Sequence, residues 1–156
     1  MLNQDQSGVT LALNSGALAT GSTLSQIAIA TAVNYLFKGV FFQRATSASI
    51  AFPIVPGTGL PATPNAYTNL PTGFTCAYLI VVDPLNSNAV AGVQGAIVPN
   101  GDGAPVPPVP NNKVAIGIMK IVNTSVGDFI AGTTLSDVAG ITDTYINLGS
   151  HPGGSV

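Results

Sequence analysis

The stretch IAIATAVNYLFKGVFFQR, residues 27–44, decides the fold expected of this chain. Up to Phe37, its even positions are small or polar, with Leu36 as the exception. Its odd positions carry the bulky side chains of Ile27, Ile29, Val33, Tyr35 and Phe37. A period of two, with β-branched and aromatic residues on one face, indicates a β-strand.

Lys38-Gly39 supplies a two-residue turn after this strand, because glycine adopts a positive φ at little cost. We therefore expect a β-hairpin over residues 27–46. A two-residue loop would pair Phe37 with Val40, Tyr35 with Phe42, and Val33 with Arg44. The competing interpretation is a helix over residues 18–32 that begins at Ser22 or Thr23.

Four further runs predict strands. Residues 77–82 are apolar without alternation, which fits a strand buried on both faces. Residues 89–98 contain Gly92 and Gly95, which suggest a bulge or the close approach of another backbone. Residues 114–122 and 142–148 also have the composition of strands.

Two segments of the chain are rich in proline. Residues 53–73 hold too many Pro and Gly for a regular element and predict a long connection. Residues 99–112, PNGDGAPVPPVPNN, must be extended, largely as polyproline II, and predict a stiff connector or a strap across a neighbouring subunit.

The sequence favours an all-β fold, because its 18 Gly and 12 Pro accompany no Glu and few helical signals. We expect a β-sandwich or barrel with long Pro/Gly-rich loops. The predicted organisation is an extended N-terminal arm over residues 1–22, a β-rich domain over 23–148 and a flexible C-terminal tail over 149–156.

Charge is scarce. Charged residues make up 6% of the 156 residues, against roughly 25% in an ordinary soluble domain. A surface with so few ions loses little hydration when it is covered, so it suits permanent association. The four cations are too scattered to bind nucleic acid or an anionic membrane: Lys38, Arg44, Lys113 and Lys120.

No targeting or spanning segment is expected either. The first residues lack the positive region of a secretory signal peptide. Residues 24–42 are apolar enough to suggest a membrane span, but their strand periodicity explains them better.

Reactive side chains give no basis for an enzyme. The single histidine, His151, lies in the glycine-rich C-terminal tail, and Cys76 starts an apolar run where a buried, inert thiol is expected. Residues 100–103 superficially resemble a calcium loop but lack its ligand pattern. The six Asp are dispersed in turns. We predict no catalytic, cofactor-binding or metal-binding residues and no cofactor.

Several segments in order resemble small virion proteins of tailed bacteriophages. The similarity spans about two-fifths of the chain. It rests on NYLFKGVFF (34–42), VQG (93–95), PPVP (107–110), VAIGIMKI (114–121), FIAGTT (129–134) and AGITDTY (139–145). The Pro-rich residues 53–73 depart from the family pattern.

The resemblance implies a head decoration (cement) or head-fibre-type protein, commonly a trimer seated where capsomers meet. Its partners would be the major capsid protein and its own copies, with a contact through residues 1–22 or 99–112. It would be made in the host cytoplasm and reside on the outer capsid surface. The alternatives are a trimeric receptor-binding or fibre-tip domain that recognises a host-surface glycan, a self-assembling shell protein and, last, an enzyme.

Overall fold

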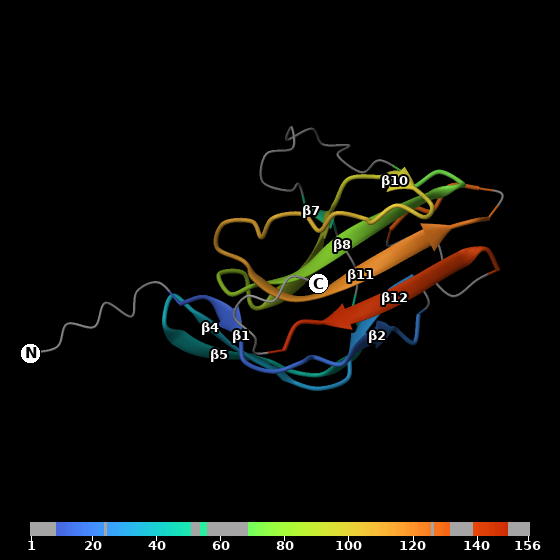
Figure 1. Ribbon diagram of the computed structural model, residues 1–156. Helices are drawn as coiled ribbons and strands as arrows, with labels where there is room; N and C mark the ends of the chain where they lie inside the picture. The colour runs from blue at the N-terminus through green and yellow to red at the C-terminus, as the bar shows by residue number, and fades with distance from the viewer. Residues whose placement is uncertain are drawn as a thin grey trace, which may run out of the picture.

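Two layers of β-strands pack face to face in the computed structural model, which describes residues 9–23, 25–50, 54–55, 69–125, 127–131 and 139–149 (Figure 1). These residues contain strands and no helix, which confirms the predicted all-β class. The strands are β1 (Leu11–Ala12), β2 (Leu18–Thr20), β3 (Ile27–Ile29), β4 (Val33–Phe37), β5 (Val40–Arg44), β6 (Ser47–Ile50), β7 (Ile54–Val55), β8 (Phe74–Asp83), β9 (Ala89–Gln94), β10 (Val98–Pro99), β11 (Val114–Asn123) and β12 (Ile141–Asn147).

The larger layer is a sheet in the order β12-β11-β8-β9-β7, with β10 also paired to β8. All of its pairings are antiparallel except that of β7 with β9. Residues 75–82 of β8 are buried on both faces, as the unbroken apolar run predicts. Successive side chains of a strand point to opposite faces, so Cys76, Tyr78 and Ile80 join one apolar cluster and Ala77 and Leu79 another.

The smaller layer consists of two three-stranded sheets, β1-β4-β5 and β2-β3-β6. The two sheets lie end to end, because the same three segments of the chain pair in both of them. Leu11 pairs with Leu36 and Leu18 with Ile29, so residues 11–20 run beside residues 27–36 in one register. Residues 40–50 run along the other side of the central strand. We call this three-stranded layer, residues 11–20, 27–37 and 40–50, the meander.

The predicted hairpin register is confirmed. Its three predicted cross-strand pairs all form: Phe37–Val40, Tyr35–Phe42 and Val33–Arg44. Lys38 and Gly39 both have positive φ, +50° and +78°, which defines the primed turn that suits the twist of a hairpin. The pairing continues past residue 46 to Ile50, which lies opposite Ile27.

Asn14 bridges the place where the meander is interrupted. Its Oδ1 accepts a hydrogen bond from the Asn34 N–H at 2.6 Å, and its Nδ2 donates one to the Ala32 carbonyl at 2.8 Å. One side chain thus replaces backbone partners that the broken ladder leaves without a strand neighbour.

From Leu11 onward, the chain forms strands of the sandwich where an extended N-terminal arm was expected. Residues Leu11–Ala12 and Leu18–Thr20 are strands β1 and β2, because Ala12 and Leu18 bury their side chains in the core between the layers. Residues 1–8 lie outside the described part of the chain, as do residues 150–156 of the expected tail.

The core lies between the two layers and is filled from both. Tyr35, Ile29 and Val33 of the meander meet Tyr78 and Ile116 of the large sheet, all essentially inaccessible to water. At one edge, Thr20 donates to Asp143 at 2.7 Å and the Leu18 N–H to Asn147 at 2.7 Å. These bonds fasten β2 of the meander to β12 of the large sheet.

The long connection predicted over residues 53–73 is wrong in one detail, because it contains strand β7, Ile54–Val55. Leu70 is also fixed, through a backbone bridge to Phe129 and full burial. Residues 56–68 lie outside the described part. No helix in the described residues is long and apolar enough to cross a membrane.

Candidate functional site

The residues with chemical potential are separated by the fold. Cys76 is fully buried, and its Sγ lies 3.4 Å from the Gly95 carbonyl oxygen. Burial raises the pKa of this thiol to about 11, so it stays protonated and unreactive at neutral pH. Burial likewise raises the pKa of Tyr78, beside it. His151 lies outside the described residues.

Three of the four described aspartates bind side chains that are distant in the sequence. Asp83 forms an ion pair with Lys113, Asp143 accepts from Thr20, and Asp128 accepts from Asn69 at 3.4 Å. Asp102 is exposed in the proline-rich segment. The described ranges contain no group of three His, Cys, Asp or Glu that could hold a metal ion.

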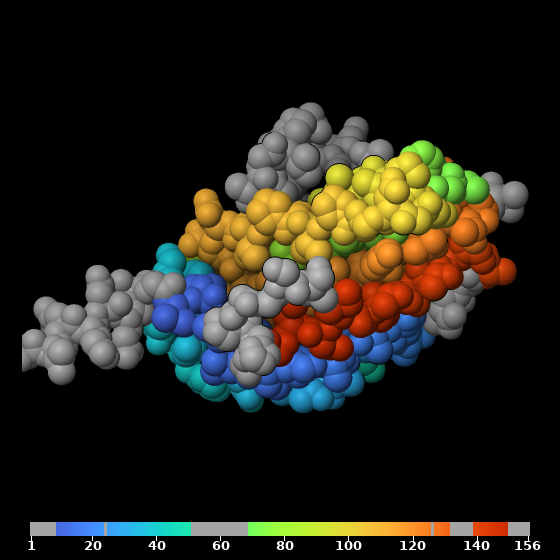
Figure 2. Space-filling view, viewed as in Figure 1, coloured from blue at the N-terminus to red at the C-terminus, as the bar shows by residue number. Residues whose placement is uncertain are grey.

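The proline-rich residues 99–112, which we call the strap, lie on the outer face of the large sheet. In Figure 2, the yellow and gold atoms of the strap lie over β8. Ala104 packs against the cluster that contains Leu79, and Pro107 is buried. The strap thus covers part of this chain's own sheet.

Gly95 permits this cover, as the sequence suggested for a close backbone approach. An alanine Cβ at this position would lie 2.5 Å from the Pro105 carbonyl oxygen and 2.8 Å from that of Ala77. Real Cβ atoms do not come so close to backbone, so only glycine lets the strap pass here. Asn100 fastens the start of the strap, donating from Nδ2 to the Asn123 carbonyl at 3.0 Å.

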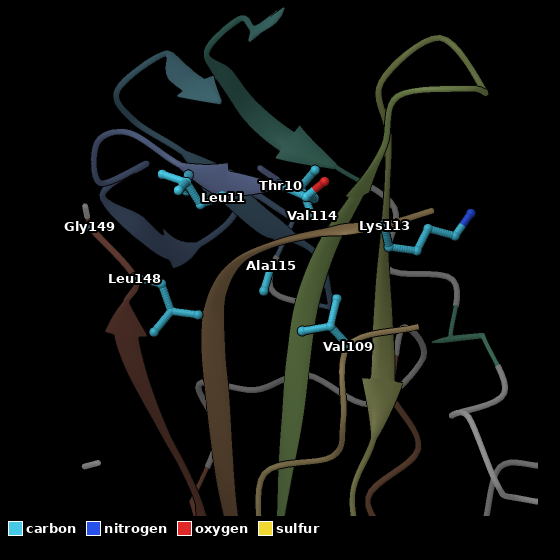
Figure 3. Close-up of a pocket in the computed structure, with 9 residues that line it drawn as sticks. Thr10, Leu11, Val109, Lys113, Val114, Ala115, Leu148 and Gly149 are labelled. Atoms are coloured by element: carbon cyan, nitrogen blue, oxygen red, sulfur yellow. The ribbon is translucent and has the colours of Figure 1, made fainter. Parts of the chain in front are cut away.

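A groove of about 390 Å³ opens where the strap, β1 and the end of β12 meet. It is lined mostly by apolar groups of Leu11, Val109, Ala115 and Leu148 (Figure 3). The Lys113 side chain runs away from Leu148 toward its ion-pair partner Asp83. The groove therefore presents apolar surface without a charge aimed into it.

A hydrogen-bonded cluster ties the meander to the β8–β9 turn. The buried Tyr35 donates from its hydroxyl to Asn88 Oδ1 at 2.5 Å, and Asn88 Nδ2 donates to the Gln43 carbonyl at 3.2 Å. Burial raises the pKa of Tyr35; the charge of Arg44 lowers it in part and that of Asp83 adds to the rise. The phenol therefore stays a neutral hydrogen-bond donor.

The outer face of the meander differs from that of the large sheet. Leu11, Leu36 and Phe41 lie opposite one another on adjacent strands and form an apolar row across this face. Phe41 is 58% exposed. Beside the row, Gln43 Nε2 donates to Asn34 Oδ1 at 2.8 Å, and Ala19 lies opposite Ala28 further along.

No charged side chain of the described meander strands points outward. Arg44 pairs with the buried Val33 and so shares its inner side, and its Nε is buried. We call the outward positions of the meander, among them Leu11, Leu36 and Phe41, the open face. Nothing among the described residues of this chain covers Phe41.

The open face was missed from the sequence, although one signal for it was present. Leu36 is the one bulky residue on the even positions of the 27–37 strand, and those positions face outward. Phe41 lies opposite Leu36, so the exception in the pattern marks an apolar row rather than an irregularity.

Comparisons of this chain with protein-family models, with curated proteins and with solved structures found no match to any of them.

Proposed function

We propose that this protein is a non-catalytic structural subunit that binds the outside of a bacteriophage capsid as a decoration protein and stabilises the shell. The observation that carries the proposal is the open face, an uncharged sheet surface with an apolar row that includes Phe41. Such a surface loses little hydration when it is covered, so it favours lasting association.

The dispersal of the reactive groups supports the same proposal. Cys76 is buried as a protonated thiol, and Asp83 and Asp143 are engaged in contacts that hold strands together. The phage assignment within this class rests on the order of segments that resemble decoration proteins. That resemblance also supports a homotrimer, in which each copy contacts the major capsid protein and its neighbours.

Co-sedimentation tests the proposal. Capsids of the virus that carries the gene, prepared without this protein, are mixed with the purified protein and pelleted. We expect the protein to pellet at a fixed ratio to the major capsid protein and to raise the temperature at which the capsids break. Protein that stays in the supernatant at micromolar concentration would exclude a decoration role.

A glycan array run on the same preparation examines the receptor-binding alternative. Saturable binding of one glycan class, together with no capsid binding, would replace the proposal with that alternative.

A further inference from the structure

We propose that the strap carries a docking surface for another protein, a ridge of proline and valine side chains that fits a groove lined by aromatic rings. The ridge consists of the exposed residues Pro105, Val106, Pro108 and Val109. It lies on the outer side of the strap, whose atoms form part of the molecular surface in Figure 2. The inference goes beyond the proposed function and does not depend on it.

The backbone of residues 104–110, APVPPVP, has little conformational freedom. Proline fixes φ at about −65°, and four of these seven residues are prolines. A residue that precedes a proline is restricted to extended conformations, and this applies to Ala104, Val106, Pro107 and Val109. The segment is therefore held as polyproline II, a helix with three residues per turn. A partner that binds this segment loses little free energy in ordering it.

The burial of this segment repeats every third residue, as expected for a polyproline II helix that lies on a surface. Pro107 is buried, and Ala104 and Pro110, one turn away on either side, are half-buried. The ridge residues between them are exposed, Val106 at 49% and Val109 at 47%. One of the three faces of the helix thus lies on the large sheet, and the other two remain for a partner.

The exposed groups of the ridge define the chemistry of the partner. Proline has no N–H, so the backbone of the ridge offers mainly carbonyl groups. In the described part of the chain, backbone hydrogen bonds outside the strands use the carbonyls of Pro99 and Pro110 and none between them. No charged residue lies between Asp102 and Lys113. The ridge therefore fits an uncharged groove whose aromatic rings pack on proline and whose Trp N–H or Tyr O–H groups donate to these carbonyls.

Another copy of this chain does not supply such a groove from its described residues. The chain has no tryptophan, and Phe41 is the one aromatic residue among the exposed large apolar side chains of the described part. The groove of about 390 Å³ beside Val109 has no aromatic residue in its lining (Figure 3). The partner that fits the ridge is therefore a different protein.

Tryptophan fluorescence tests the inference, because this chain has no tryptophan and the signal comes from the probe alone. The probes are isolated WW-type domains, whose aromatic-lined grooves bind polyproline II. Each domain is titrated with the full chain and, in parallel, with a synthetic peptide of residues 104–110. We expect saturable binding of both by the same domains.

Two results of this titration would overturn the inference. If every domain that binds the peptide fails to bind the full chain, the large sheet hides the faces that an aromatic groove needs. If no domain binds either of them, the segment lacks the chemistry that such a groove recognises.

Variants of the full chain place the contact on the ridge. Val106→Asp combined with Val109→Asp should weaken binding at least about 10-fold, because two charges would lose their hydration in an apolar groove. Val40→Asp is the matched control, because Val40 is 58% exposed on the meander, in the other layer of the sandwich. We expect this control to bind as wild type does.

A milder variant guards against misfolding. Val106→Ala combined with Val109→Ala should keep the wild-type circular dichroism spectrum and weaken binding less than the charged variant does. Unchanged affinity of the charged variant would overturn the ridge as the contact. Capsid co-sedimentation decides the proposed function separately, because it does not require the ridge to bind an aromatic groove.

Discussion

The sandwich has two outer faces, and they differ in what covers them. The large sheet is covered in part by its own chain: the strap passes over β8 and leaves Leu79 2% exposed (Figure 1). The meander has no such cover among the described residues, and Phe41 stays 58% exposed. Both faces are apolar and charge-poor. Composition alone therefore does not identify an interface, because the fold determines which apolar face is covered by the chain itself.

The largest effect is expected from a substitution that displaces the strap from the large sheet. Gly95→Ala places a Cβ 2.5 Å from the Pro105 carbonyl oxygen, so either the strap or β8 must shift. We expect a loss of about 3 kcal/mol in the free energy of unfolding, measured by chemical denaturation, as for other overpacked cores.

Gly103→Ala is the matched control for that substitution, because it lies on the same strap with nothing within 4 Å of its Cβ position. We expect it to stay within about 1 kcal/mol of wild type. Equal effects of the two substitutions would show that the strap does not press on β8.

The free energy of unfolding at alkaline pH tests the large sheet from its inner side, because the buried Cys76 contacts Gly95, the residue over which the strap passes. Its pKa is about 11 in the fold and about 8.5 in an unfolded chain. The folded state therefore binds more protons between these values, and stability falls as pH rises. We expect Cys76 to account for a loss of about 2 kcal/mol between pH 7 and pH 10.

Denaturation of the Cys76→Ala variant at both pH values checks this expectation. The variant should lose most of that pH dependence and retain the smaller part that Tyr78, whose pKa is also raised, contributes. A variant with the same pH dependence as wild type would contradict the buried, protonated thiol.

The smallest expected effect concerns how the meander is held to the large sheet. Tyr35→Phe removes the hydroxyl that donates to Asn88 at 2.5 Å and leaves the ring in place. We expect a loss of about 1 kcal/mol in the free energy of unfolding, with the oligomeric state unchanged, because the bond lies on the inner side of the meander. A change in oligomeric state would mean that the β8–β9 turn takes part in self-association.

The sequence was sufficient to predict the features that depend only on residues close together in the chain. The turn at Lys38-Gly39 allows a loop of two residues, and alternation then fixes every pair from Val33 to Arg44. The burial of β8 on both faces also follows from an apolar run without alternation. Such features need only the order of neighbouring residues.

The remaining features depend on contacts between distant segments. Strand β1 has only two residues and no readable period, and it is ordered by its pairing with β4 and by Asn14. The strap was expected to be extended, but nothing in its prolines shows which sheet it would cover. The open face required both the pairing of Leu36 with Phe41 and the knowledge that the strap lies elsewhere.

Hydroxyl-radical footprinting across a dilution series tests the difference between the two faces most directly, because it reports the solvent exposure of individual side chains. We predict that labelling of Phe41 and Leu36 falls as protein concentration rises, since other copies cover them. Labelling of Leu79 should stay low and that of Leu85 high at every concentration, since the fold alone sets their exposure. Phe41 labelling that stays as high as that of Leu85 at every concentration would show that no other copy covers the open face.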